Sequence, residues 1–178
     1  MAKSEEILQE KVANYLVQNY PDVLFHSDYG SGAKLTKGQS AKQKRLNGGR
    51  RAWPDLVIAQ PRAGSIEFGP FKAEMDERGR VHCLSQQVNL PPQIFCGLYL
   101  ELKKEEERLH PGPRSRACNR FKSIDGAEYR TRHFMEQADV LEKLRQRGYF
   151  AAFAVGYDEA INMITTYLGE PIKQEVEF

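Results

Sequence analysis

The sequence predicts an α/β fold in which a small mixed sheet carries helices on its faces. Two patterns favour this fold: apolar residues recur at helical spacing near both ends of the chain, and β-prone apolar runs lie between these helices. The 178 residues suffice for one domain, and their composition, 40% hydrophobic and 28% charged, is typical of globular proteins. Residues 1–178 are therefore expected to form a single domain.

The first expected element is a helix over residues 4–18. Ser4 can cap its N-terminus, and Glu5 and Glu6 in the first turn suit the positive end of the helix dipole. Its apolar face consists of Leu8, Val12, Tyr15 and Leu16. A Tyr-Pro pair ends the helix, and a short strand is expected over residues 23–26.

A basic segment follows at residues 29–51. No acidic residue occurs between Asp28 and Asp55, and glycine and serine are frequent, so we expect a mobile basic loop. Unopposed positive charge repels itself unless a polyanion neutralises it, which predicts contact with nucleic acid; a solvated loop is the alternative. The basic residues of this segment are Lys34, Lys37, Lys42, Lys44, Arg45, Arg50 and Arg51. A second basic stretch spans residues 114–132.

One strand is expected before a long insertion and one after it. Residues 56–59 are apolar and β-prone and predict a buried strand, while residues 98–103 alternate apolar and polar side chains. Residues 60–97 contain Gly-Pro and Pro-Pro pairs between short apolar pieces. This composition favours an inserted hairpin or β-rich arm rather than a core strand.

The last part of the chain is expected to return to the sheet. Residues 104–130 are charged and predict a loop, residues 131–147 a helix that Gly148 stops, and residues 149–155 a buried strand. Asp158 is expected to cap a final helix.

Three polar residues lie on or beside two of the predicted strands: Asp55, Glu101 and Lys103. Residues two apart on a strand point to the same face, so Glu101 and Lys103 project together. If the two strands are neighbours, Asp55 and Glu101 converge at one edge of the sheet. Two carboxylates with open water positions suit a hard divalent cation such as Mg²⁺, and Lys103 can then orient a water or stabilise phosphate oxygens. A surface ion pair is the alternative.

This pattern, Asp followed by Glu-x-Lys on the next core strand, resembles the motif of the PD-(D/E)xK nuclease superfamily, and its flanks resemble the VRR-NUC family. Residues 5–16 look like that family's first helix, and residues 51–56 (Arg-Ala-Trp-Pro-Asp-Leu) look like its Gly-x-Pro-Asp element. Residues 98–103 (Leu-Tyr-Leu-Glu-Leu-Lys) resemble its Glu-x-Lys strand, and residues 136–155 its Gln helix and closing strand. The chain departs from the family by an Ala in place of the usual Gly, by the insertion, and by a longer spacer before the Gln.

The resemblance implies a restriction-endonuclease-like core in the order α-β-β-β-α-β, with the β-rich arm inserted. It also implies a Mg²⁺- or Mn²⁺-dependent DNA endonuclease in which Asp55, Glu101 and the carbonyl of Leu102 hold the metal. The products would carry 5′-phosphate ends. Stand-alone members from phages and bacteria act on branched DNA as homodimers, so structured DNA is the expected substrate and a homodimer is an option.

Two further residues are candidates for the site. At 100° per residue, Glu5 falls on the inward face of the first helix with Leu8 and Val12, where a metal or Lys103 would pair with it. The helix dipole alone is the alternative explanation for this acid. Gln137 can hold a metal-associated water or a phosphate, or it can cap a loop.

The expected function is therefore metal-dependent DNA cleavage in the cytoplasm of a bacterium or of a phage-infected cell. No stretch approaches the ~20 apolar residues needed to cross a bilayer. Three widely spaced cysteines do not favour a disulfide framework. The alternatives are a sequence-specific restriction-type endonuclease, with residues 60–97 reading bases, and a non-catalytic DNA-binding protein that keeps the fold. We also expect the anchors of residues 60–97 to lie beside the metal site, where the insertion would govern substrate choice or self-association; a decorative loop is the alternative.

Overall fold

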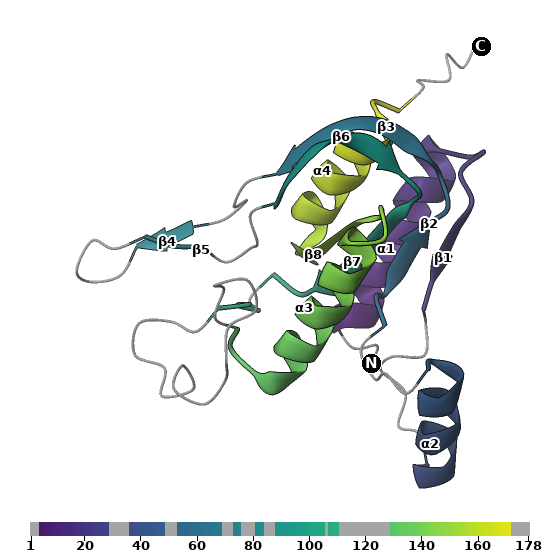
Figure 1. The fold of residues 1–178 in the computed structure, drawn as a ribbon, viewed down its shortest axis with the longest axis vertical. Coiled ribbons are helices and arrows are strands. Elements are labelled where there is room, and N and C mark those ends of the chain that lie inside the picture. The colour runs from purple at the N-terminus through teal and green to yellow at the C-terminus, as the bar shows by residue number, and fades with distance from the viewer. Residues whose placement is uncertain are drawn as a thin grey trace.

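A four-stranded mixed sheet forms the centre of the protein (Figure 1). The computed structural model describes residues 4–28, 36–48, 53–68, 73–75, 81–83, 88–105, 107–110 and 129–171. The sheet has the strand order β1-β2-β7-β8, formed by Phe25–Ser27, Leu56–Ile58, Leu98–Lys103 and Phe150–Val155. The pairs β1–β2 and β2–β7 are antiparallel, and β7–β8 is parallel. The mixed α/β fold expected from the sequence is therefore observed.

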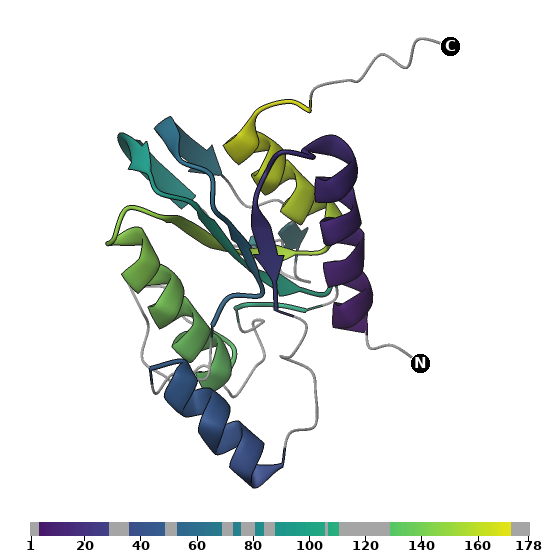
Figure 2. The ribbon, with the colours of Figure 1, turned by 90° about the vertical axis from the view of Figure 1, so that its right-hand side faces the viewer.

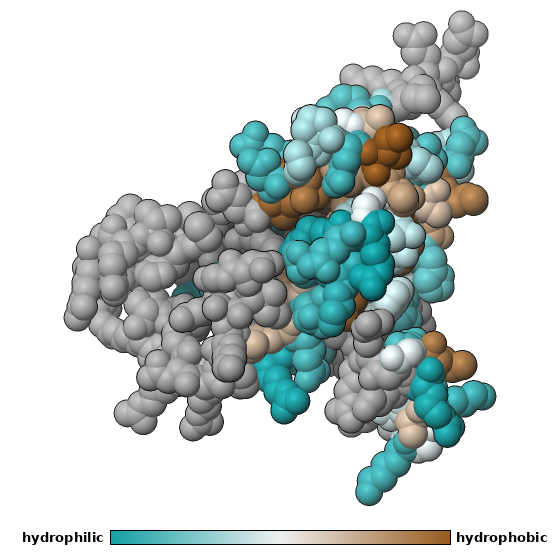
Figure 3. Space-filling view, in the orientation of Figure 1, coloured by the Kyte–Doolittle hydropathy of each residue, from teal (hydrophilic) through white to brown (hydrophobic). Residues whose placement is uncertain are grey.

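Helices cover both faces of this sheet (Figure 2). The helices α1 (Ser4–Asn19) and α4 (Tyr157–Leu168) contact each other on one face, and α3 (Arg132–Arg145) lies on the other. Hydrophilic side chains cover the outward face of α3 (Figure 3). Among the described residues, no helix combines the length and the apolar character that crossing a bilayer requires.

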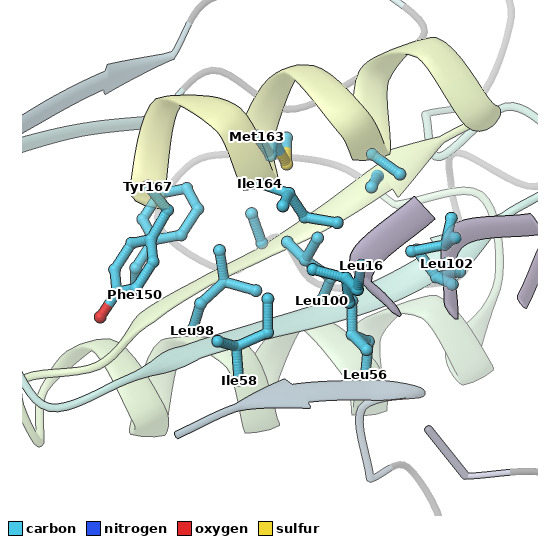
Figure 4. Packing of buried hydrophobic residues seen from close by; sticks show 14 of the residues in the cluster. Leu16, Leu56, Ile58, Leu98, Leu100, Leu102, Phe150, Met163, Ile164 and Tyr167 are labelled. Carbon is cyan, nitrogen blue, oxygen red and sulfur yellow. The ribbon is translucent and has the colours of Figure 1, made fainter. Parts of the chain in front are cut away.

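The alternation along β7 separates two apolar clusters. Its even-numbered residues, Leu98, Leu100 and Leu102, pack with residues of α1 and α4, such as Leu16 and Ile164 (Figure 4). Tyr99 packs on the opposite side, against the cluster that α3 supplies. Side chains of successive strand residues point to opposite faces, so Glu101 and Lys103 are directed to the α3 side as well.

The outer edge of β8 is closed by two side chains. Phe150 N–H donates to the Gly97 carbonyl at 2.9 Å, so the backbone groups of Ala151 and Val155 face away from β7. Arg145 Nη1 donates to the Ala151 carbonyl at 2.9 Å, and Val155 N–H donates to Glu159 Oε2 at 2.7 Å. These contacts satisfy polar groups at the edge of a fully buried strand.

The basic segment at 29–51 contains a helix where a loop was expected. Residues Lys37–Leu46 form α2, which lies outside the two helical layers in both ribbon views. A capping box explains its start: Gln39 N–H donates to Thr36 Oγ1 at 3.3 Å, and Thr36 N–H donates to Gln39 Oε1 at 2.9 Å. The prediction of a loop was wrong here because the frequent glycine and serine masked this local signal.

The insertion consists of antiparallel strand pairs. Arg62–Phe68 (β3) pairs with Val88–Phe95 (β6), and Ala73–Met75 (β4) pairs with Val81–Cys83 (β5). The β3–β6 pair arches over α4 (Figure 1), and its buried side chains Ile66, Val88 and Phe95 join the main core.

The insertion leaves the sheet at the end opposite the candidate site, which corrects the expectation that its anchors lie beside the metal. Because β2 and β7 are antiparallel, Ile58 is opposite Leu98, and the connection starts and ends there. Asp55 and Lys103 lie at the other ends of the same two strands. The β3–β6 pair packs on α4, so this part of the insertion belongs to the folded core, while its role in substrate choice or self-association stays a prediction.

The final helix begins two residues earlier than expected. Its N-cap is Gly156, with a φ of 83° and no side-chain cap, and Asp158 lies in the first turn. The predicted capping role of Asp158 was therefore wrong, although its charge suits the helix dipole there. In contrast, Thr131 caps α3 by accepting a hydrogen bond from Phe134 N–H at 3.3 Å.

Among the described glycines, Gly97 leaves the least space for a Cβ atom. A Cβ atom at this position would lie 2.7 Å from the carbonyl oxygen of Ile58, a backbone atom that cannot rotate away. We expect Gly97→Ala to lower the free energy of unfolding by about 1–3 kcal/mol, measured by chemical denaturation. Gly38→Ala is the matched control, because a Cβ there meets nothing within 4 Å. A loss no larger than that of the control would contradict this account of the close approach between Gly97 and Ile58.

Candidate active site

Four polar side chains meet at the free end of β7 although all of them are buried. Asp55 immediately precedes β2, Glu101 and Lys103 belong to β7, and Gln137 belongs to α3. Their exposed fractions are 6%, 4%, 5% and 4%, in that order. Ionisable groups are seldom this buried unless they are paired, so the cluster has to be explained by its contacts.

The length difference between β2 and β7 fixes the position of Asp55. The ladder between these strands ends at Leu56 opposite Leu100, so β7 continues beyond its partner. Leu102 N–H, which would otherwise lack a partner on that side, donates to Asp55 Oδ2 at 2.9 Å. The carboxylate thus completes the sheet edge and is held within reach of Glu101.

Glu101 is the hub of the remaining contacts. Lys103 Nζ lies 2.8 Å from Glu101 Oε1, and Gln137 Nε2 donates to the same oxygen. Lys103 Nζ also lies 5.4 Å from the centre of the Phe134 ring, within range of a cation–π interaction. Strand β7 and helix α3 therefore hold the carboxylate and the ammonium in fixed positions.

The cluster carries an excess of negative charge when all of its groups are ionised, since two carboxylates face one ammonium. Burial, and next the Asp55 carboxylate, raise the pKa of Glu101 to about 8, although Lys103 opposes the shift. Burial alone would lower the pKa of Lys103, but the charges of Glu101 and Asp55 raise it above its ordinary value. The lysine thus stays charged, and a proton on Glu101 or an external cation balances the site.

The side-chain amide of Gln137 has one unsatisfied hydrogen-bond acceptor. Its Oε1 atom is buried and has no hydrogen-bond partner among the described residues, whereas its Nε2 donates to Glu101. An unsatisfied buried acceptor costs about 1–3 kcal/mol. A donor such as a water on a bound cation, or a group of a substrate, would remove this cost.

A cation at this position would have two carboxylates from the protein. Within the part of the chain that the structure describes, no three His, Cys, Asp or Glu side chains are grouped as metal ligands. One or two carboxylates with several waters is the usual protein environment of Mg²⁺, whereas structural zinc takes four protein ligands. The donor set therefore fits a hard divalent cation that keeps open coordination positions.

Glu5, expected on the inward face of α1, is exposed. Leu8 and Val12 are buried as predicted, and Gln9 beside them is 8% exposed. Glu5 lies in the first turn, at the end of the helix. Helical spacing predicts on which side of the helix a residue lies, but it does not predict how far along the helix the packed surface extends. The predicted burial of Glu5 was therefore wrong, and no direct contact joins it to the four-residue cluster.

His133 and Phe134 are site residues that the sequence reasoning missed. Gln137 follows them by four and three positions, so the three side chains share one face of α3. Burial and the Lys103 charge lower the pKa of His133, while the Glu136, Glu107 and Glu5 carboxylates act in the opposite direction. The spacing from Gln137 was the available signal for both residues.

Four of the predicted nucleic-acid residues belong to helix α2, which is not one of the elements that form the cluster. Lys37, Lys42 and Arg45 are exposed on α2, and Lys44 belongs to the same helix. Lys34, Arg50 and Arg51 lie outside the described residues. No acidic residue occurs within α2.

No protein-family model matches the chain, and no curated protein is similar to it. Among solved structures, a protein titled "VRR_NUC domain protein" is similar with a TM-score of 0.47 and 20% sequence identity, over 96% of this chain and 93% of that chain. At this TM-score and identity, the likeness assigns neither a family nor an activity to the chain.

The raised pKa of Glu101 predicts how stability depends on pH. The folded protein keeps a proton near pH 8 that the unfolded chain releases near 4.5, so this stabilisation is complete below about pH 4.5 and is lost as the pH rises to about 8. Glu101→Gln mimics the protonated form and does not titrate. With a chelator present, we expect the variant to gain about 3 kcal/mol on the wild type between about pH 5.5 and about pH 9, measured by chemical denaturation. Glu10→Gln, an exposed control, should show no gain. A pH-independent difference between wild type and Glu101→Gln would refute the assignment.

Proposed function

We propose that the protein is a divalent-cation-dependent DNA endonuclease that hydrolyses phosphodiesters and leaves 5′-phosphate ends. The observation that carries this proposal is the buried cluster of Asp55, Glu101 and Lys103, in which two carboxylates lie beside one ammonium, together with the Gln137 acceptor that no described residue satisfies. A purely structural ion pair needs one carboxylate for one ammonium. The second carboxylate is suited to a bound cation, and the additional acceptor is suited to a ligand that donates a hydrogen bond.

Asp55, Glu101 and the Leu102 carbonyl are the proposed ligands of the cation, Mg²⁺ or Mn²⁺. Leu102 N–H points toward Asp55, and the N–H and C=O of a strand residue leave the strand on the same side. The Leu102 carbonyl is therefore directed to the side of β7 where β2 has already ended. When bound, the cation supplies a lowered pKa for water and charge neutralisation at the phosphate.

The remaining residues of the cluster position the reactants. Lys103 is fixed by Glu101 and by the Phe134 ring, so its ammonium can stabilise the negative charge that develops on the phosphate oxygens. Gln137 Oε1 can accept a hydrogen bond from the attacking water and hold it in line. The proton of that water leaves to solvent, and the 3′ oxygen of the substrate is the leaving group.

Helix α2 is the proposed contact to the DNA backbone. Lys37, Lys42 and Arg45 are exposed on a helix without acidic residues, so nothing within the helix competes for a phosphate. Branched or otherwise structured DNA is the proposed substrate class, on the resemblance of the motifs to the VRR-NUC family.

Substitutions in the cluster should separate catalysis from folding. We expect Asp55→Asn and Lys103→Met to reduce Mg²⁺- or Mn²⁺-dependent cleavage at least about 100-fold in single-turnover assays, and Gln137→Ala about 10- to 100-fold. Asp22→Asn removes an exposed carboxylate and serves as the control, with unchanged cleavage expected. Thermal unfolding of each variant verifies that it folds. Cleavage by folded Asp55→Asn at the wild-type rate would rule out the proposed site.

Neutralising α2 should change how binding depends on salt. Each lost phosphate contact lowers the slope of log affinity against log salt concentration by about 0.9 on duplex DNA. We expect the combined replacement of Lys42, Lys44 and Arg45 by Gln to reduce the slope by about 2–3, measured by fluorescence anisotropy with a chelator present. Lys11→Gln, exposed on α1, should leave it unchanged. An unaltered slope in the triple variant would move the binding surface to another part of the protein.

A further inference from the structure

Trp53 lies beside the candidate site but has no role in the proposed chemistry. It is the only tryptophan of the chain and stands two residues before Asp55. Two residues of extended chain span about 7 Å at most, so its backbone lies close to that carboxylate. Its side chain is 39% exposed, whereas Pro54 and Asp55 directly after it are buried. A large apolar side chain is thus presented to solvent next to a buried polar cluster.

The Trp53 ring is supported by a row of aromatic residues. It meets Tyr99 edge to face, with ring centres 6.2 Å apart and planes at 88°. Tyr99 in turn meets Tyr149 at 5.1 Å and 87°. Tyr99 lies two residues before Glu101 on β7, so its side chain is on the same face of the sheet as Glu101 and Lys103. The indole is therefore anchored at one side to the face that carries the candidate site.

From this placement we infer that Trp53 is a stacking site for an unpaired nucleobase next to the scissile phosphate. An indole face stacks on any base because every base has a π-face, and it needs no hydrogen bonds to do so. A base inside a regular duplex has both faces covered by its neighbours. Only a base in a single strand, a bulge, a gap or a branch offers a free face. The basic α2 precedes Trp53 in the chain and supplies the sequence-independent contact to the phosphates.

This inference deepens the proposed function and rests on it. It identifies the preferred substrate as DNA in which at least one base beside the cleaved bond is unpaired. Selectivity for structured DNA then needs no reading of base sequence. This selectivity follows from the free energy that is needed to unpair and unstack a base of a duplex before the base can stack on the indole.

The single tryptophan makes a direct test possible on the unmodified protein. With a chelator present to prevent cleavage, intrinsic fluorescence is recorded while three oligonucleotide probes are added: a full duplex, the same duplex with a one-base bulge, and a single strand. We expect saturating bulged and single-stranded DNA to quench Trp53 at least about twice as strongly as duplex DNA, because stacked bases quench an indole. Binding of all three probes with an unchanged signal would overturn the inference.

Two variants test the preference independently of fluorescence. Trp53→Ala should lose about 10-fold in affinity for the bulged probe relative to the duplex, equivalent to ~1.4 kcal/mol, whereas Trp53→Phe should keep most of the preference. Ile94→Ala, which removes an exposed apolar side chain from β6, is the control and should change neither affinity. An undiminished preference in folded Trp53→Ala would also overturn the inference.

Cleavage assays with Mg²⁺ on the same probes distinguish the two proposals. Cleavage that does not favour unpaired bases, together with a silent Trp53, would remove the stacking site and leave the endonuclease intact. Absence of cleavage on every probe by the folded protein would refute the endonuclease and, with it, the role given to Trp53.

Discussion

The unequal lengths of β2 and β7 are the constraint on which the candidate site depends. Strand β2 ends its pairing at Leu56, so the last part of β7 has no backbone partner on that side. The Asp55 carboxylate accepts the hydrogen bond that another strand residue would have accepted. The same register places the insertion at the far end of the two strands. One pairing therefore determines at which end of the sheet the acidic cluster lies and at which end the additional strands are accommodated.

Burial of this polar cluster lowers the stability of the fold. Asp55, Glu101 and Lys103 are almost entirely buried, and Gln137 contributes an acceptor that no residue in the described part of the chain satisfies. Well-packed apolar residues would give a more stable sheet end, because a buried ion pair seldom repays its desolvation. The retention of two carboxylates for one ammonium is therefore understandable as preorganisation for a cation and a phosphate. Stability and the proposed chemistry compete at the same few atoms.

Three of the proposed contributions to substrate binding and cleavage come from one continuous part of the chain. Helix α2 carries the exposed positive charges, Trp53 the exposed aromatic face, and Asp55 the first carboxylate, in that order along the sequence. Backbone contact, base contact and chemistry would then follow one another over roughly the length of a strand and a helix. Such an arrangement separates affinity, which α2 would supply, from the choice of DNA form, which Trp53 would supply.

The sequence by itself determined the mixed α/β fold, the strand Leu98–Lys103, and the candidate residues Asp55, Glu101 and Lys103, because these depend on local periodicity and on residue chemistry. Only the tertiary structure decided that Glu5 is exposed, that His133 and Phe134 adjoin the site, and that the insertion packs on α4. The capping box of α2 was a local signal and could have been found. The other features depend on which residues far apart in the chain come into register. Periodicity states the direction in which a side chain points, but only the packing of complete elements decides what it meets there.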